Sequence, residues 1–242
     1  MSFARSIPTV VREEGSNKIA MDLYSQLAKD RIILLSGVVD FVLADLVCAQ
    51  LLFHQSTDPK RPIQMYINSP GGYVTAGLAI YDLMQHVTCP VETIVMGHAV
   101  SMAAILLVSG AKGRRAAMPN AEIMIHQVSG GFSGQATDAE IHMTQMLKTK
   151  RQLTQIVANH SGRSYDEILA ACERDRFLTA EEAKAYGLID LVVGTAVTPK
   201  AEVGTSAESS IGGRARRTRG SRGVSQASKG EAKRTQRRRG VE

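Results

Sequence analysis

Short apolar runs rich in β-branched residues alternate with longer segments of helical periodicity between residues 31 and 127. The β-branched runs predict strands over four ranges: Arg31–Ser36, Ile63–Asn68, Glu92–Met96 and Ala121–Ile125. Apolar residues spaced three and four apart predict the helices between them: Ala44–Phe53, Thr75–His86 and Ser101–Val108. Strands that alternate with helices are typical of a mainly parallel sheet with right-handed crossovers. The pattern therefore predicts an α/β domain.

The pattern changes after residue 127. Three glycines between Gly130 and Gly134 disfavour regular secondary structure in that segment. The spacing of apolar residues over Ala136–His160 then predicts one long helix with a partial apolar face. Its basic side chains, Lys148, Lys150 and Arg151, are expected to face water. Because a helix this long leaves the sheet, we expect it to pack against another element or chain.

Two capping boxes mark the start of shorter helices near the end of the domain. Ser164 with Glu167 predicts a helix that begins at Tyr165, and Thr179 with Glu182 predicts one that begins at Ala180. Gly187 is expected to end the second helix, before a last strand over Leu188–Val193.

The net charge of +6 is unevenly distributed. From Val197 to Glu242 there are 12 Lys and Arg residues against 4 Asp and Glu, and the rest of the chain has 17 against 19. This tail is rich in Gly, Ser and Ala and has almost no large apolar residues, which predicts disorder. Arginine runs can bind polyanions, but a solvated tail without a fixed partner is the simpler interpretation, and nucleic acid is not expected as a partner.

Composition narrows the class of protein further. The longest apolar stretch, residues 102–109, is too short to span a bilayer, so no membrane partner is expected. The three cysteines, Cys48, Cys89 and Cys172, are scattered, which favours neither a disulfide framework nor a metal cluster. Residues 1–11 show no secretory signal but lack acidic residues, which also fits the end of an organellar presequence.

Three places carry candidate chemistry. Ser101 follows a turn of small residues and begins an apolar helix, a position where serine is most often an N-cap. The paired glycines at Gly71 and Gly72 let the backbone approach a ligand, or simply make a turn. His126 directly follows an apolar strand, as a structural histidine also can. Spacing alone does not assemble these parts, because catalytic triads form in space rather than in sequence.

Six segments in fixed order decide between these interpretations: MYINSPGG, GLAIYD, GHAVSMAA, IMIHQ, GGFSGQATDAEIH and ERDRFLTAEEAKAYGLID. Together they resemble the proteolytic subunit of the Clp protease, ClpP, from about residue 7 to residue 193. The resemblance implies the ClpP/crotonase-like spiral of βαβ units with a protruding handle helix at about residues 129–160. It divides the chain into an N-terminal axial-loop segment (1–15), a serine peptidase domain (16–196) and the basic tail (197–242).

The resemblance also assigns the chemistry. Ser101 matches the nucleophile, His126 the general base and Asp175 the acid that orients the histidine. The backbone N–H groups of Gly72 and Met102 match the oxyanion donors. No metal or organic cofactor is implied, and the expected activity is endopeptidase cleavage of unfolded polypeptides through an acyl-enzyme.

Family members assemble as two stacked heptameric rings, so the resemblance implies a homo-oligomer of that kind, with Arg174 at the contact between rings. The implied partner is an AAA+ unfoldase of the ClpX type, which hydrolyses the ATP; this chain has no phosphate-binding loop of its own. The docking pocket for that ATPase is expected at five positions, Leu52, Phe53, Tyr66, Ile94 and Met96.

Four positions depart from the family pattern. His98 stands in place of Gln, Val128 in place of Pro, and Gln64 and His86 in place of aromatic residues. None belongs to the expected triad. Two other functions remain open: a catalytically silent ring subunit, and an acyl-CoA hydratase or isomerase on the same fold. The basic extension and the segment at residues 64–66 resemble mitochondrial members, which favours the mitochondrial matrix over a bacterial cytoplasm or a plastid.

Overall fold

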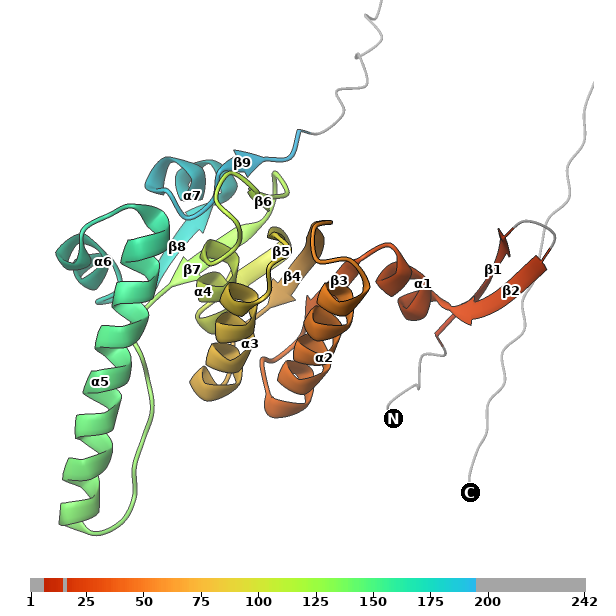
Figure 1. The fold of residues 1–242 in the computed structure, drawn as a ribbon. Helices are drawn as coiled ribbons and strands as arrows, with labels where there is room; N and C mark the ends of the chain where they lie inside the picture. Colours follow the sequence, from red (N-terminus) through yellow and green to blue (C-terminus); the bar gives the residue numbers. More distant parts are fainter. Residues whose placement is uncertain (1–6, 15–16, 195–242) are drawn as a thin grey trace, which may run out of the picture. The chain divides into compact units, whose positions relative to one another are not determined.

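The computed structural model describes residues 7–14 and 17–194 (Figure 1). The predicted disordered tail, Val197–Glu242, lies outside the described residues, as do residues 1–6 of the axial-loop segment.

A seven-stranded sheet forms the centre of the domain. Five strands pair in parallel in this order: β3 (Ile32–Ser36), β4 (Ile63–Ser69), β5 (Val91–Val100), β6 (Arg115–Ala117) and β9 (Leu191–Val192). A second branch leaves β5, where β7 (Glu122–Ile125) pairs in parallel and β8 (Arg176–Thr179) adds antiparallel to β7. The prediction of an α/β domain with a mainly parallel sheet is therefore confirmed.

Strand β5 is twice as long as predicted. Its first half, Thr93–Val95, pairs with β6, and its second half, His98–Val100, pairs with β7. The prediction that residues 97–100 form a turn was wrong, because the small residues that suggested it are accommodated by an irregularity within the strand. The ladder with β4 shifts register between Ile67 and Ser69, and Gly97 has a φ of 81°.

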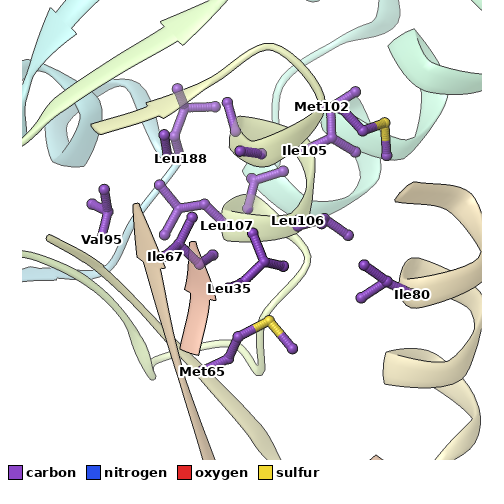
Figure 2. Packing of buried hydrophobic residues seen from close by; sticks show 14 of the residues in the cluster. Leu35, Met65, Ile67, Ile80, Val95, Met102, Ile105, Leu106, Leu107 and Leu188 are labelled. Carbon is purple, nitrogen blue, oxygen red and sulfur yellow. The ribbon is translucent and has the colours of Figure 1, made fainter. Parts of the chain in front are cut away.

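Three helices connect the parallel strands: α2 (Phe41–Thr57), α3 (Val74–His86) and α4 (Met102–Val108). Helices α2 and α3 lie side by side along one face of the sheet (Figure 1). All seven residues of α4 are buried, because this helix lies inside the core rather than on its surface. Figure 2 shows its side chains packed among residues from the strands, α3 and the segment before β9, including Leu35, Met65, Ile67, Ile80 and Leu188.

The predicted long helix is confirmed as α5 (Ala136–Ser161). Its buried residues all lie in the second half, between Leu153 and Ala158, and they contact the core. The first half extends beyond the sheet (Figure 1) and exposes Ile141, Met143 and Leu147. A helix with an exposed apolar face in one half and a buried face in the other is suited to contact a further chain.

Both predicted capping boxes are present. Ser164 begins α6 (Tyr165–Ala171), and Thr179 begins α7 (Ala180–Tyr186), which Gly187 ends in a left-handed conformation. The last strand is shorter than predicted, because Leu188 and Ile189 turn into the core and only residues 191 and 192 pair with β6.

The segment expected to form the axial loop contains the first strand of a hairpin. Strands β1 (Thr9–Glu14) and β2 (Asn17–Asp22) pair as an antiparallel hairpin, and α1 (Leu23–Lys29) follows. Asp22 caps α1 by accepting a hydrogen bond from the Ser25 N–H. None of the helices in the described ranges is long and apolar enough to cross a bilayer.

Candidate active site

Ser101 lies at the junction between β5 and α4 in a strained conformation, with a φ of 57° and a ψ of −122°. Such backbone strain in a non-glycine residue is concentrated at functional sites. The side chain does not cap the helix, so the common structural role of a serine at this position does not apply. Its hydroxyl Oγ instead lies 2.8 Å from His126 Nε2.

The strand ladders explain why these two residues meet. Val100 is paired with Met124 in the β5–β7 ladder, and the Ser101 N–H donates to the Met124 carbonyl at 2.9 Å. The residues that follow each strand therefore leave the sheet at the same edge. His126 follows β7 directly, so its ring lies beside Ser101.

Asp175 reaches the same histidine through a second ladder. The antiparallel pairing of β7 with β8 ends at Ile125 opposite Arg176. One further step of that register sets His126 opposite Asp175, and His126 Nδ1 lies 3.3 Å from Asp175 Oδ1. Two residues far apart in the chain are thus neighbours because of β8, a strand that the apolar pattern did not predict.

The two contacts together favour one tautomer of the imidazole. The Asp175 carboxylate, 3.3 Å from Nδ1, favours a proton on that nitrogen, which leaves the Nε2 lone pair facing the Ser101 hydroxyl. The hydroxyl then donates to Nε2. This arrangement can draw a proton from the serine when its oxygen attacks an electrophile.

The expected oxyanion donors lie beside the serine. Val39 N–H donates to Gly71 C=O, and Tyr73 N–H donates to Val39 C=O, both at 2.8 Å. In a parallel bridge of this kind the amide of the residue between them, Gly72, points away from Val39. Met102 is the first residue of α4, so its N–H has no acceptor within the helix. Gly72 and Met102 line one cavity together with Ser101 and His126.

A second, largely apolar cavity adjoins the serine. Its walls come from β7, α4, the second half of α5 and the end of α6, and its lining includes Ile105, Ile125, Leu153, Val157 and Cys172. Val128, one of the departures from the family pattern, lines both cavities. Burial raises the pKa of the Cys172 thiol to about 11, so this sulfur is protonated at neutral pH and is no rival nucleophile.

The residues expected to contact other chains differ in their exposure. Arg174 is exposed and forms no ion pair or hydrogen bond within the described part of the chain. Leu52 and Phe53 are exposed on α2, whereas Tyr66 and Met96 are half-buried. Ile94, the ladder partner of Tyr66, is only 8% exposed, so it offers little surface in a single chain.

Two side chains near the site were not recognised in the sequence. Lys150, expected to face water, is 24% exposed in its side chain and donates to Gln127 Oε1 at 2.8 Å. Gln127 follows His126 and donates from Nε2 to the Glu173 carbonyl at 3.0 Å. A lysine on a long helix carries no signal that it turns back toward the sheet, so only the packing of α5 reveals the contact.

In the described ranges, no group of three His, Cys, Asp or Glu side chains is arranged to hold a metal ion. A family model described as Clp protease matches residues 14–196, well over half of the chain. The matched range includes Ser101, His126 and Asp175 and leaves out the whole basic tail, residues 197–242.

Proposed function

The chain belongs to the Clp protease family, and we propose that it is the serine endopeptidase subunit of an ATP-dependent Clp-type protease. The observation that carries the proposal is the pair of contacts on the two nitrogens of His126, with the Ser101 hydroxyl on one side and the Asp175 carboxylate on the other.

The chemistry follows from that geometry. His126 Nε2 takes the Ser101 proton as Oγ attacks the peptide carbonyl. The carbonyl oxygen, as it becomes negatively charged, accepts hydrogen bonds from the Gly72 and Met102 amides. The Asp175 carboxylate stabilises the imidazolium, which then protonates the leaving amine. The resulting acyl-enzyme is hydrolysed by a water that His126 deprotonates. His126 thus relays both protons, the first from Ser101 to the leaving amine and the second from the water back to Ser101.

The cleft beside Ser101 is narrow and has Gly72 and Val74 in one part of its lining and His126 and Val128 in another. A narrow cleft of this kind suits a single extended chain better than a folded surface. An extended, unfolded polypeptide can present its backbone and a side chain to the site at once, which supports unfolded proteins as the substrate class.

We propose that the subunit works within two stacked heptameric rings that form a closed chamber. The exposed apolar side chains on the first half of α5 support a contact with another subunit, because apolar surface of this kind is usually covered. Arg174 is the candidate for an ion pair between rings. A ClpX-type AAA+ unfoldase would dock at Leu52, Phe53, Tyr66, Ile94 and Met96 and hydrolyse the ATP, so this chain needs no cofactor of its own. The mitochondrial matrix is the compartment that we propose.

An acyl-CoA hydratase or isomerase fits the cavity less well. The Gly72 and Met102 amides would suit a thioester oxygen, but that chemistry moves protons with carboxylates. The side chains that face each other here are a serine and a histidine, and the carboxylate of Asp175 lies behind the histidine. Only a measurement of peptidase activity distinguishes a catalytically silent ring subunit from the proposed enzyme.

The proposal is tested with a serine-selective phosphonate probe and a fluorogenic peptide. We expect Ser101→Ala to abolish both labelling and turnover while the rings still assemble, because the Ser101 side chain makes no capping bond that the fold would lose. Ser56→Ala, at an exposed position on α2, serves as the control and should retain both signals. Turnover that survives in the Ser101→Ala protein would refute the triad.

A further inference from the structure

Three residues join the handle helix to the segments that carry the histidine and the aspartate. Lys150 Nζ, on α5, donates to Gln127 Oε1 at 2.8 Å and lies 3.7 Å from Glu173 Oε2. Gln127 Nε2 in turn donates to the Glu173 carbonyl oxygen at 3.0 Å. The three groups close a small triangle in which each touches the other two.

The position of this triangle relates it to the proposed triad. Gln127 follows His126, and Glu173 precedes Asp175 by two residues. The Asp175 side chain is 63% exposed, and within the described ranges its only polar side-chain contact is with His126. The β7–β8 ladder holds this segment from Arg176 onward. On the other side of Asp175, the contacts of Glu173 with Gln127 and Lys150 hold it.

A lysine at residue 150 favours one orientation of the Gln127 amide. An ammonium group can only donate hydrogen bonds, whereas the two ends of a glutamine amide have opposite roles. Lys150 therefore requires the Gln127 oxygen to face it, and the amide NH₂ must then face the Glu173 carbonyl. Without Lys150 the amide is held by its bond to the Glu173 carbonyl alone, and the Glu173 carboxylate loses its charge partner.

We propose that Lys150 is a positioning residue, which orients the Gln127 amide and anchors the Glu173 segment so that Asp175 stays against His126. The inference rests on the proposed function, because the alignment of Asp175 matters only if His126 acts as the base. It also makes Lys150 the side chain through which the packing of the handle helix reaches the triad. Lys150 does not touch the reacting atoms in this role.

A direct role in substrate binding is the competing explanation, because Lys150 also lines the apolar cavity beside Ser101. The two roles differ in the kinetic constant that they affect. Loss of a binding contact raises KM and leaves kcat in place, whereas misalignment of the triad lowers kcat. A misplacement of about 1 Å can cost on the order of a hundredfold in rate.

The experiment compares Lys150→Met with Lys148→Met in the full-length protein. Methionine keeps an unbranched apolar stem at residue 150 but removes the charge and the donor. Lys148 is an exposed lysine on the same helix and makes no polar contact within the described part of the chain. We expect kcat of Lys150→Met to fall about ten- to a hundredfold, with KM and the sedimentation of the assembly unchanged. Lys148→Met should match the wild type, and Lys150→Arg, which keeps the donors, should recover most of kcat.

A double-mutant cycle of Lys150→Met with Gln127→Met tests whether Lys150 acts through the Gln127 amide. If Lys150 acts through the Gln127 amide, the double variant is no slower than the slower of the two single variants. Multiplicative losses would overturn the route, and a raised KM at unchanged kcat would assign Lys150 to substrate binding instead. A loss of activity that accompanies loss of the assembly, with Lys150→Arg equally affected, would overturn the inference as well.

The same measurements separate this inference from the proposed function. If wild-type turnover does not depend on Ser101, the proposed function fails, whatever Lys150 does. If turnover depends on Ser101 but Lys150→Met keeps the wild-type kcat, only the positioning role fails.

Discussion

Substitution of Gly71 by alanine should damage catalysis far more than it damages the fold. A Cβ on Gly71 would lie 2.6 Å from the Val100 carbonyl oxygen, 2.8 Å from Ser101 Cβ and 3.0 Å from Met102 N. Ordinary contact begins at 3.4 Å, so the segment must move by about 0.8 Å, the difference from the shortest of these distances. The partner atoms are the carbonyl oxygen before the nucleophile, the Cβ of the nucleophile itself and the amide nitrogen after it, and Gly72 follows directly in the displaced segment. A displacement near 1 Å at reacting groups costs on the order of a hundredfold in rate.

Gly37→Ala provides a matched control. Gly71 and Gly37 both have a φ of 88°, but a Cβ on Gly37 meets nothing within 4 Å. Both alanines therefore pay the same left-handed backbone strain, about 1–2 kcal/mol, and only Gly71→Ala adds the overlap with Ser101. With a fluorogenic peptide, at a temperature well below the thermal unfolding midpoints of both variants, we expect kcat of Gly71→Ala to fall about ten- to a hundredfold below that of Gly37→Ala. If the two variants have the same kcat, the approach of Gly71 to the nucleophile has no catalytic importance and the placement of the oxyanion donors is wrong.

Two further predictions concern stability and assembly. Arg115 donates to Asp190 Oδ2 at 2.8 Å and holds the pKa of this carboxyl below its ordinary 3.8, so the ion pair stabilises the fold above that pH and is lost as the pH falls through the lowered value. Asp190→Asn leaves the buried Arg115 side chain without its charge partner, which we expect to lower the free energy of unfolding by about 3–5 kcal/mol at pH 7; in urea titrations the difference from the wild type should narrow in acid, and a constant difference would count against the ion pair. Arg174→Ala should lower peptidase activity and the fraction of double rings in parallel, with both restored at high protein concentration. An inactive Arg174→Ala protein that sediments as an intact double ring would instead place this arginine in the active site.

The apolar pattern was sufficient for the parallel core of the fold. The β-branched runs of β3, β4 and β7 and the periodic helices α2, α3 and α5 were each predicted within a few residues of their ends, because burial on one or both faces leaves a strong signal. The capping boxes at Ser164 and Thr179 gave helix starts directly, since the cap is a local interaction.

The elements that were missed have in common that they depend on partners distant in the chain. Strand β6 has three residues, and β8 buries only one of its four, so neither shows the apolar run that marks β7. Residues 97–100 contain small side chains typical of a turn, yet they are strand because β7 supplies a ladder for them. In the hairpin at the N-terminus, the alternation of polar and apolar residues is weak, and the β1–β2 pairing is fixed mainly by the backbone.

The residues of the proposed triad also differ in whether the local sequence predicts them. Ser101 and His126 each had a local signal, because one begins an apolar helix and the other ends an apolar strand. Asp175 had none: it lies on an exposed segment, and only resemblance to a family selected it. Its place beside His126 comes from the antiparallel register of β8, and we infer that Lys150 of α5 holds the other end of that segment. The base is thus fixed by the sheet, whereas the acid that orients it depends on the sheet and on the handle helix together. A serine peptidase built in this way is sensitive to whatever α5 contacts, because a shift of that helix would move Lys150 and, through Gln127 and Glu173, the segment that carries Asp175.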